Sequence, residues 1–478
     1  MKKRIIDFIK KNIITILVIT AIIFEVILYV FTPHIEKIIV HICTLTVVSI
    51  TTLYLLLNGN KDFKKDLFLL VFIIGLLVRT IYIFKTSIYE RQHDVQNLFE
   101  KGHLDYIYTL FTTHRLPTTN IWQFYHPPLW HFIGALWLWI NKLFKIELFI
   151  SLEGLQILSL LLSLFTIIIA NSICIKLKIK DKYRYIVDLF FATHLSLVIL
   201  SGSVNNDCLL LFLEMLTILV LINFNENENW KNTIYLAIVT GLCVMTKISG
   251  AVMAIPIMYI FIKKFIYYLN ENKDKLKIYI NKIIAFGLIS LTIGLWYQVR
   301  NLILFGTTAV PEPSDWLYVG NHSIISRFFT INIHELFNYA NTDSNYNLPS
   351  FIIISSLFGE FTFDRVYMLR YILISLNLIL IFISMLFMIK YIIKDRKNIV
   401  INILIITWLS FIISAYIFNY KYPYACSMDF RYITICLLPG VVIIYYELQK
   451  IKNKFLNIFI QLLSYLFIIS SILFTIVF

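Results

Sequence analysis

The sequence has 478 residues, of which 59% are hydrophobic and only 15% are charged. So little charge cannot cover a soluble globule of this length, which excludes an ordinary water-soluble enzyme. Apolar runs of about 20 residues recur almost from end to end and predict an all-α polytopic membrane protein. The net charge of +14 is then explained by Lys and Arg flanking the spans, and no nucleic-acid partner is expected.

The apolar runs predict about thirteen transmembrane helices. They are expected at 12–31, 37–57, 66–86, 148–175, 185–202, 206–225, 231–246, 250–268, 278–300, 367–393, 399–418, 430–447 and 455–477. The first run follows a basic N-terminus without a small-residue cleavage site, which predicts a retained anchor. The six cysteines are scattered without a Cys-x-x-Cys motif, so neither a disulfide framework nor a zinc site is expected.

A polar island between Tyr89 and Trp130 interrupts this apolar pattern and is followed by the apolar segment 127–144. If segment 127–144 lies on the outer surface, four groups of basic residues share the cytoplasmic side, as the positive-inside rule requires. These groups are at 176–184, 263–277, 394–397 and 450–454. The island itself is then extracytoplasmic.

Segment 127–144 is expected to form an interfacial helix on the outer leaflet. Four of the eight tryptophans lie in or near it, and indole rings favour the headgroup level: Trp122, Trp130, Trp137 and Trp139. Pro127 and Pro128 suit the first turn of such a helix. The alternative is an ordinary span with a Trp-rich end.

These features divide the chain into three parts. Residues 1–65 are expected to form two additional N-terminal transmembrane helices, 66–447 a catalytic transmembrane region, and 448–478 a C-terminal transmembrane helix. External loops are expected at 87–147 and 303–365. The second loop is rich in turn residues and long enough to cover a site as a lid.

Several polar motifs fall on the outer face in a fixed order along the chain. They are Asp94, His126-Pro127-Pro128-Leu129, Asn206-Asp207, Thr246-Lys247, Trp296-Tyr297-x-x-Arg300-Asn301 with Gly306, and Arg431-Tyr432. This ordered set, over about residues 66–447, resembles the C-type (GT-C) polytopic glycosyltransferases. The resemblance is to the branch of protein O-mannosyltransferases and lipid A aminoarabinose transferases.

The resemblance implies an enzyme that moves a sugar from a polyprenyl-phosphate donor to an acceptor glycan, lipid or protein outside the cell membrane, with inversion. Such a transfer requires a base for the acceptor proton and cations for the departing phosphate. Asp94 matches the position of the family's catalytic acidic residue and is predicted to be the base. The alternative is that Asp94 caps a helix or lies in a solvated loop.

Arg300, Lys247 and Arg431 are predicted to bind the donor phosphate, with Arg300 the strongest candidate. The alternative is that these basic side chains only reach lipid headgroups from the ends of spans.

His93, His126 and Asp207 are predicted to contact substrate, although each residue type is also common in capping or packing roles. No metal site is assigned, because the histidines of the island lack paired ligand spacing. Whether the protein uses a divalent cation as a cofactor stays open, because some relatives of the family use one and others do not.

The second functional class is a transporter or flippase for lipid-linked glycans, and a glycan polymerase or ligase is a third. A transporter would carry charged groups near the bilayer midplane in two related halves. The acids within apolar runs, Glu25, Glu153 and Glu214, are better explained by structural hydrogen bonds. The charged motifs gather at one face instead, which favours the enzyme.

Overall fold

The computed structural model describes residues 37–58, 63–308, 317–337, 346–363 and 366–478. Regular structure within these residues is helical, apart from two isolated bridges between extended residues. The expected span 12–31, Glu25 and the Pro311-Glu312-Pro313 turn lie outside the described residues.

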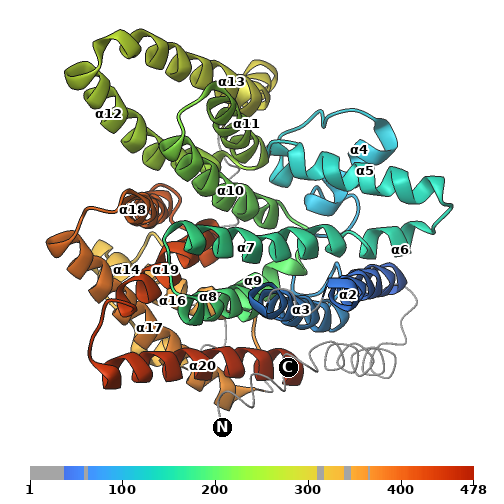
Figure 1. The fold of residues 1–478 in the computed structure, drawn as a ribbon. Helices are drawn as coiled ribbons and strands as arrows, with labels where there is room; N and C mark the ends of the chain where they lie inside the picture. Colours follow the sequence, from blue (N-terminus) through green and yellow to red (C-terminus); the bar gives the residue numbers. More distant parts are fainter. Residues whose placement is uncertain (1–36, 59–62, 309–316, 338–345, 364–365) are drawn as a thin grey trace.

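The long helices lie side by side (Figure 1). The helices up to α11 are α2 (Ile38–Asn58), α3 (Phe63–Phe84), α4 (His103–Thr113), α5 (Leu129–Leu143), α6 (Leu148–Glu153), α7 (Gln156–Lys176), α8 (Asp181–Thr193), α9 (Leu195–Ser201), α10 (Asp207–Glu226) and α11 (Trp230–Thr246). The later helices are α12 (Ala254–Glu271), α13 (Lys273–Phe305), α14 (Ile324–Phe328), α15 (Ile333–Phe337), α16 (Leu348–Phe358), α17 (Tyr367–Lys394), α18 (Ile399–Lys421), α19 (Leu437–Leu448) and α20 (Lys454–Val477). Short 3-10 helices are η2 (Trp122–Tyr125), η3 (Ile248–Met253), η6 (Ala425–Met428) and η7 (Phe430–Cys436).

Nine helical segments among the described residues are long and apolar enough to cross a membrane, or ten if the bent pair α8–α9 counts as one span. The prediction of a polytopic helical membrane protein is therefore confirmed, but the count of thirteen is not. In the described part of the chain, α2 and α11 fall short of a span by length or composition, although both lie where spans were predicted.

The expected span 185–202 is broken rather than straight. Helices α8 and α9 meet at a bend of 45°. The fully buried Arg79 on α3 donates hydrogen bonds to the carbonyl oxygens of Phe191 and Ala192, at the end of α8. Within a bilayer these freed carbonyls need a donor, and Arg79 supplies it.

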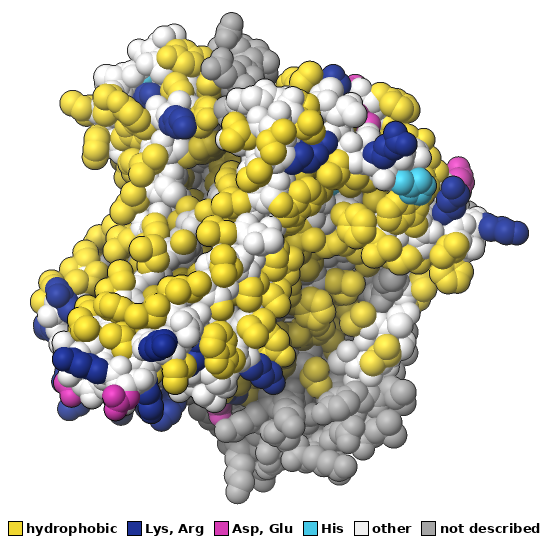
Figure 2. Space-filling model, turned by 90° about the horizontal axis from the view of Figure 1, so that it is seen from above, with side chains coloured by type: hydrophobic (Ala, Val, Ile, Leu, Met, Phe, Trp, Pro, Cys, Tyr) yellow, Lys and Arg dark blue, Asp and Glu magenta, His cyan; other side chains and the backbone are white. Residues whose placement is uncertain are grey.

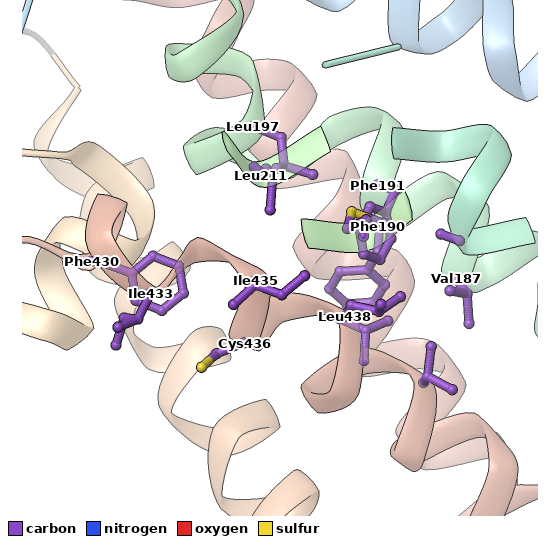
Figure 3. Packing of buried hydrophobic residues seen from close by; sticks show 14 of the residues in the cluster. Val187, Phe190, Phe191, Leu197, Leu211, Phe430, Ile433, Ile435, Cys436 and Leu438 are labelled. Atoms are coloured by element: carbon purple, nitrogen blue, oxygen red, sulfur yellow. The ribbon is translucent and has the colours of Figure 1, made fainter. Parts of the chain in front are cut away.

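Helices α8 and α10 pack against the segment that contains η7 and α19. Figure 3 shows Phe190 and Phe191 close to Leu438, and Ile433 and Ile435 on the same segment. All five side chains are buried. Lipid tails are as apolar as these side chains, so close packing, rather than transfer out of water, holds the helices together in the bilayer.

The outer surface suits a lipid environment. Figure 2 shows mainly hydrophobic side chains across the middle of one face, with Lys and Arg towards its ends. In α12 and α13 only 28% and 22% of the apolar span is buried within the protein. At 33 residues, α13 is about 50 Å long and exceeds the hydrocarbon thickness of about 30 Å.

The four basic groups assigned to the cytoplasmic side lie at one end of the helices. Hydrogen bonds and ion pairs connect them to each other or to the end of α10: Lys176 with Glu226, Lys264 with Glu228, Lys180 with Gln449, and Lys450 with Asp395. Asp207 lies at the opposite end of α10. A helix of 20 residues is about 30 Å long, so Asp207 is about that far from the basic groups.

Helix α5 covers most of segment 127–144, which is expected to be interfacial, but its tryptophans do not serve mainly as exposed anchors. Trp130 is fully buried against α10, and the indole N–H groups of Trp137 and Trp139 donate to the carbonyl oxygens of Ser151 and Phe111. Of the four tryptophans in or near this segment, only Trp122, in η2, is exposed. With 15 residues, α5 is about 22 Å long and too short to cross the bilayer alone.

The segment 303–365, which is expected to be an external loop, contains the buried helix α16. Asn347 caps α16 by accepting a hydrogen bond from the Ser350 N–H. Phe351, Leu357 and Phe358 are nearly inaccessible in the core. The 11-residue apolar run is too short to predict a span, and it is flanked by turn-rich segments, so the helix was not predicted from sequence.

Candidate active site

A cluster of charged side chains forms where four segments meet at the N-terminal end of α10. The loop before α4 contributes Asp94, and α10 begins with Asp207. Lys247 follows α11, and η7 contributes Arg431. Ion pairs join these four residues, which were all predicted from sequence as site residues.

Asp94 forms the closest ion pair with Arg431, at 2.9 Å. Its side chain is 40% exposed, whereas that of Arg431 is 5% exposed. Burial raises the pKa of the Asp94 carboxyl, but Arg431 and the neighbouring His103, His93 and Lys247 together outweigh burial and lower the pKa to about 2. Asp94 is therefore an ionised carboxylate at neutral pH with one side open.

The backbone holds Asp94 in an unusual conformation, with φ of +57°. Asp adopts this left-handed region more readily than most residues, but at some cost in energy. The carbonyl oxygen of Asp94 accepts a hydrogen bond from the backbone N–H of His103, and that of Val95 from Leu104. A Cβ on Gly102 would lie 2.1 Å from the Val95 carbonyl oxygen, so only glycine fits there.

Arg431 lies among three carboxylates. Besides Asp94, the carboxylate oxygens of Asp207 and Asp429 lie 3.9 and 3.7 Å from its guanidinium. Lys247 forms a 2.5 Å ion pair with Asp207, and its ammonium lies 4.5 Å from the centre of the Tyr432 ring. The cluster thus contains two cations in a buried setting, where electrostatic interactions are strong.

His93 lies beside a second acidic pair. Its Nδ1 lies 2.7 Å from Oε1 of Glu360 and 3.8 Å from Oδ2 of Asp429. One ligand atom from each of these three side chains lies within 4.8 Å of the others, a grouping that could hold a metal ion. Neither Glu360 nor Asp429 was predicted from sequence to be a site residue.

His126 belongs to a group of buried rings beside this cluster. Its ring stacks on His103, and Nδ1 of His103 lies 2.9 Å from Nε2 of His131. Burial lowers the pKa of His103 to about 4 and lowers the pKa of His126 and His131 well below the usual value. The three imidazoles are therefore neutral at physiological pH.

Arg300, the strongest phosphate candidate by sequence, lies apart from these ion pairs. Its guanidinium donates to the Pro117 carbonyl oxygen at 2.7 Å and to the Asn301 side chain at 3.1 Å. It also lies over the Tyr297 ring. No ion pair joins Arg300 to an acidic side chain in the described part of the chain. Arg300 thus connects α13 to the segment that follows α4.

The arrangement provides the parts that a group transfer to an alcohol or amide acceptor requires. An ionised, accessible carboxylate lies beside two buried cations, at the positive end of the α10 dipole. The carboxylate can take a proton, and the cations can stabilise a phosphate.

Solved structures that are similar to this chain include those of an archaeal oligosaccharyltransferase. The apo form of the Archaeoglobus fulgidus oligosaccharyltransferase is similar over 87% of this chain, with a TM-score of 0.50 and 12% sequence identity. The same enzyme, tethered through a disulfide to an acceptor peptide containing the NVT sequon, gives a TM-score of 0.50 and 12% identity over 87% of this chain. The chain has a GT-C fold. No family model and no curated protein matches the sequence.

The GT-C fold predicted from the ordered motifs is therefore confirmed, while the mannosyltransferase or aminoarabinose transferase branch is not. The chain spans about half the length of the solved oligosaccharyltransferases, covering 56% of the apo form and 55% of the tethered form. At this identity the similarity establishes the fold alone.

Proposed function

We propose that this protein is a membrane glycosyltransferase that transfers a sugar from a polyprenyl-phosphate-linked donor to an acceptor glycan, lipid or protein. The observation that carries the proposal is the ion pair between the accessible Asp94 and the buried Arg431, at one end of a GT-C fold. The transfer occurs on the extracytoplasmic face of the cell membrane and inverts the anomeric centre.

Arg431 and Lys247 are the proposed ligands of the donor phosphate. The planar guanidinium can present two parallel N–H donors to phosphate oxygens, and the Lys247 ammonium adds a point charge. A phosphate that engages Arg431 competes with Asp94 for the guanidinium. Donor binding would then release the carboxylate and make it more basic, at the moment when a base is required.

Asp94 is the proposed general base. It takes the acceptor proton as the acceptor attacks the anomeric carbon from the face opposite the phosphate, and the phosphate leaves with the bonding electrons. A single displacement of this kind inverts the configuration. Asp207 is held by Lys247 and Arg431, and it is proposed to orient the sugar or acceptor together with His93 and His126.

The sidedness of the proposal is supported by the basic groups at the far end of α10. The positive-inside rule assigns that end to the cytoplasm, so the Asp207 end is proposed to be extracytoplasmic. The largely unburied faces of α12 and α13 are compatible with a polyprenyl tail that reaches the site from the lipid. The flippase alternative predicts charged groups along the bilayer path, whereas these ion pairs gather at one end.

The test is transfer from a panel of polyprenyl-phosphate sugars by the purified full-length protein, comparing wild type with Asp94→Asn. Loss of the base should lower kcat by about 10²–10⁴-fold with a smaller change in donor KM. Asp181→Asn, at the opposite end of the helices, is the matched control and should leave kcat unchanged. Near wild-type turnover in Asp94→Asn would remove Asp94 from the base role.

A further inference from the structure

His93, Glu360 and Asp429 come from three separate segments and direct their polar atoms at one point. The ligand atoms lie within 4.8 Å of one another, with His93 Nδ1 between the two carboxylates. Two ligands bound to one transition-metal ion lie about 3–4 Å apart, since each bond is about 2.0–2.2 Å long. The observed spacing requires only small side-chain movements to meet this geometry.

The imidazole of His93 is held in place by the turn that follows α16. Gly359 has φ of +60°, and a Cβ at this position would lie 3.3 Å from Nε2 of His93. The ring of Phe361 packs on the imidazole at a centroid distance of 4.6 Å. The turn thereby brings the adjacent Glu360 against Nδ1, so this pair of ligands is preorganised by the backbone.

Asp429 leaves one carboxylate oxygen without a hydrogen bond. Its Oδ1 accepts from the backbone N–H of Arg431, while the buried Oδ2 has no donor among the described residues. The side chain is only 1% exposed. Arg431 Nε and His93 Nδ1 lie 3.7 and 3.8 Å from Oδ2, too far for a hydrogen bond. A buried carboxylate oxygen without a hydrogen bond is costly, and a cation between Oδ2 and His93 would remove that cost.

The charge balance of the whole cluster points the same way. Four carboxylates face only two side chains with permanent positive charge: Asp94, Asp207, Glu360 and Asp429 against Arg431 and Lys247. When all four are ionised, two negative charges are left without a permanent counter-charge. One divalent cation compensates both.

We infer that His93, Glu360 and Asp429 form a binding site for a divalent transition-metal ion of the Zn²⁺ or Mn²⁺ type. One imidazole with two carboxylates suits these ions, whereas Ca²⁺ and Mg²⁺ prefer ligand sets made of oxygen alone. The inference deepens the proposed function and rests on it, because Asp429 Oδ2 also lies 3.7 Å from Arg431, so the ion would add positive charge beside the proposed phosphate site. Binding can be measured without any sugar transfer.

The experiment is calorimetric titration of chelator-treated, full-length protein with Zn²⁺, Mn²⁺ and Mg²⁺, together with metal analysis of the protein as purified. Wild type should bind one ion per chain, with Zn²⁺ tighter than Mn²⁺ and Mg²⁺ weakest. His93→Ala and Glu360→Gln should weaken binding at least about tenfold. The matched controls His114→Ala and Glu100→Gln, both at exposed positions of the polar island, should bind like wild type.

Unchanged affinity in folded His93→Ala and Glu360→Gln, or no binding by wild type, would overturn the inference. If either variant fails to fold, X-ray absorption at the zinc edge of wild type decides the question. The inference requires one imidazole nitrogen together with carboxylate oxygens, and a shell without imidazole contradicts it. Metal binding without transfer would overturn the proposed function alone, and transfer without metal binding would overturn this site alone.

Discussion

The guanidinium of Arg431 lies 2.9 Å from the carboxylate of Asp94, and this contact joins a buried cation to a half-exposed anion. The two residues come from the first polar loop and from the segment before α19. The cation is fixed by the core, while the anion can exchange partners at the surface. The ion pair therefore defines both where a phosphate would bind and which carboxylate it would release.

Replacing Arg431 with Lys should impair both donor binding and stability. The ammonium cannot match the planar fork that serves Asp94, Asp207 and Asp429, so we expect donor KM to rise at least about tenfold. Arg431→Gln removes the charge altogether and should destabilise the fold by about 3–5 kcal/mol, because it leaves buried carboxylates unpaired. Donor titration and thermal unfolding measure the two effects.

A Lys421→Gln variant is the control for Arg431→Gln. Lys421 is exposed at the end of α18, and its removal should change neither donor KM nor the melting temperature. Equal donor KM in Arg431→Lys and wild type would contradict the assignment of Arg431 to the phosphate.

Lys247 and Arg300 should give different kinetic patterns. Lys247→Met removes a cation from the ion-pair cluster and should raise donor KM about tenfold or more. Arg300→Ala removes the hydrogen bond to the Pro117 carbonyl oxygen and should act mainly on the order of the segment after α4. Steady-state kinetics and hydrogen exchange at residues 114–125 separate these outcomes.

Arg300 was the strongest phosphate candidate by sequence, so comparing Arg300→Ala with Lys247→Met can also contradict the assignment of the phosphate to Lys247. A larger rise of donor KM in Arg300→Ala than in Lys247→Met, with unchanged hydrogen exchange after α4, would restore Arg300 as the principal phosphate ligand. Arg300→Lys helps to interpret this result, since it retains the charge but not the fork geometry.

Gly102→Ala should disrupt the loop that presents Asp94. The added methyl group would lie 2.1 Å from the backbone oxygen of Val95, which cannot move without breaking the hydrogen bond from Leu104. We expect a loss of at least about 1–3 kcal/mol of stability and a fall in kcat at unchanged donor affinity. Thermal unfolding and donor titration test this expectation.

Gly287→Ala provides the matched glycine control. A Cβ at Gly287, in the interior of α13, would have no neighbour within 4 Å. Because Ala favours a helix more than Gly does, this variant should be neutral or more stable by up to about 1 kcal/mol. Equal destabilisation by both substitutions would show that the close approach at Gly102 does not control the loop.

The sequence predicted most of the fold because long apolar runs have few structural alternatives in a membrane. Helices α3, α10, α17, α18 and α20 begin and end within a few residues of the expected spans. Local sequence could not predict the break between α8 and α9, because it depends on Arg79 from a distant helix. Helix α16 was missed because 11 apolar residues are too few for a span.

The site was predicted in part for a similar reason. Asp94, Asp207, Lys247 and Arg431 were selected because sidedness placed all of them at one membrane face, and the structure brings them together. Glu360 gave no such signal, since its partner His93 is remote in sequence and the connecting turn depends on Gly359. Arg300 met the sidedness criterion as well, but sidedness cannot indicate which way a side chain points.

The two acidic residues on either side of the site, Glu360 and Asp94, belong to segments that differ in rigidity. Glu360 follows a helix packed deep in the core, whereas Asp94 lies in a loop that contains several residues with left-handed backbone angles. When a bulky molecule enters the site, the loop that contains Asp94 is therefore the segment that moves, because displacing α16 would unpack Phe351 and Leu357 from the core. Tolerance for differently shaped acceptors is accordingly a property of residues 87–102, and substitutions there should broaden or narrow it.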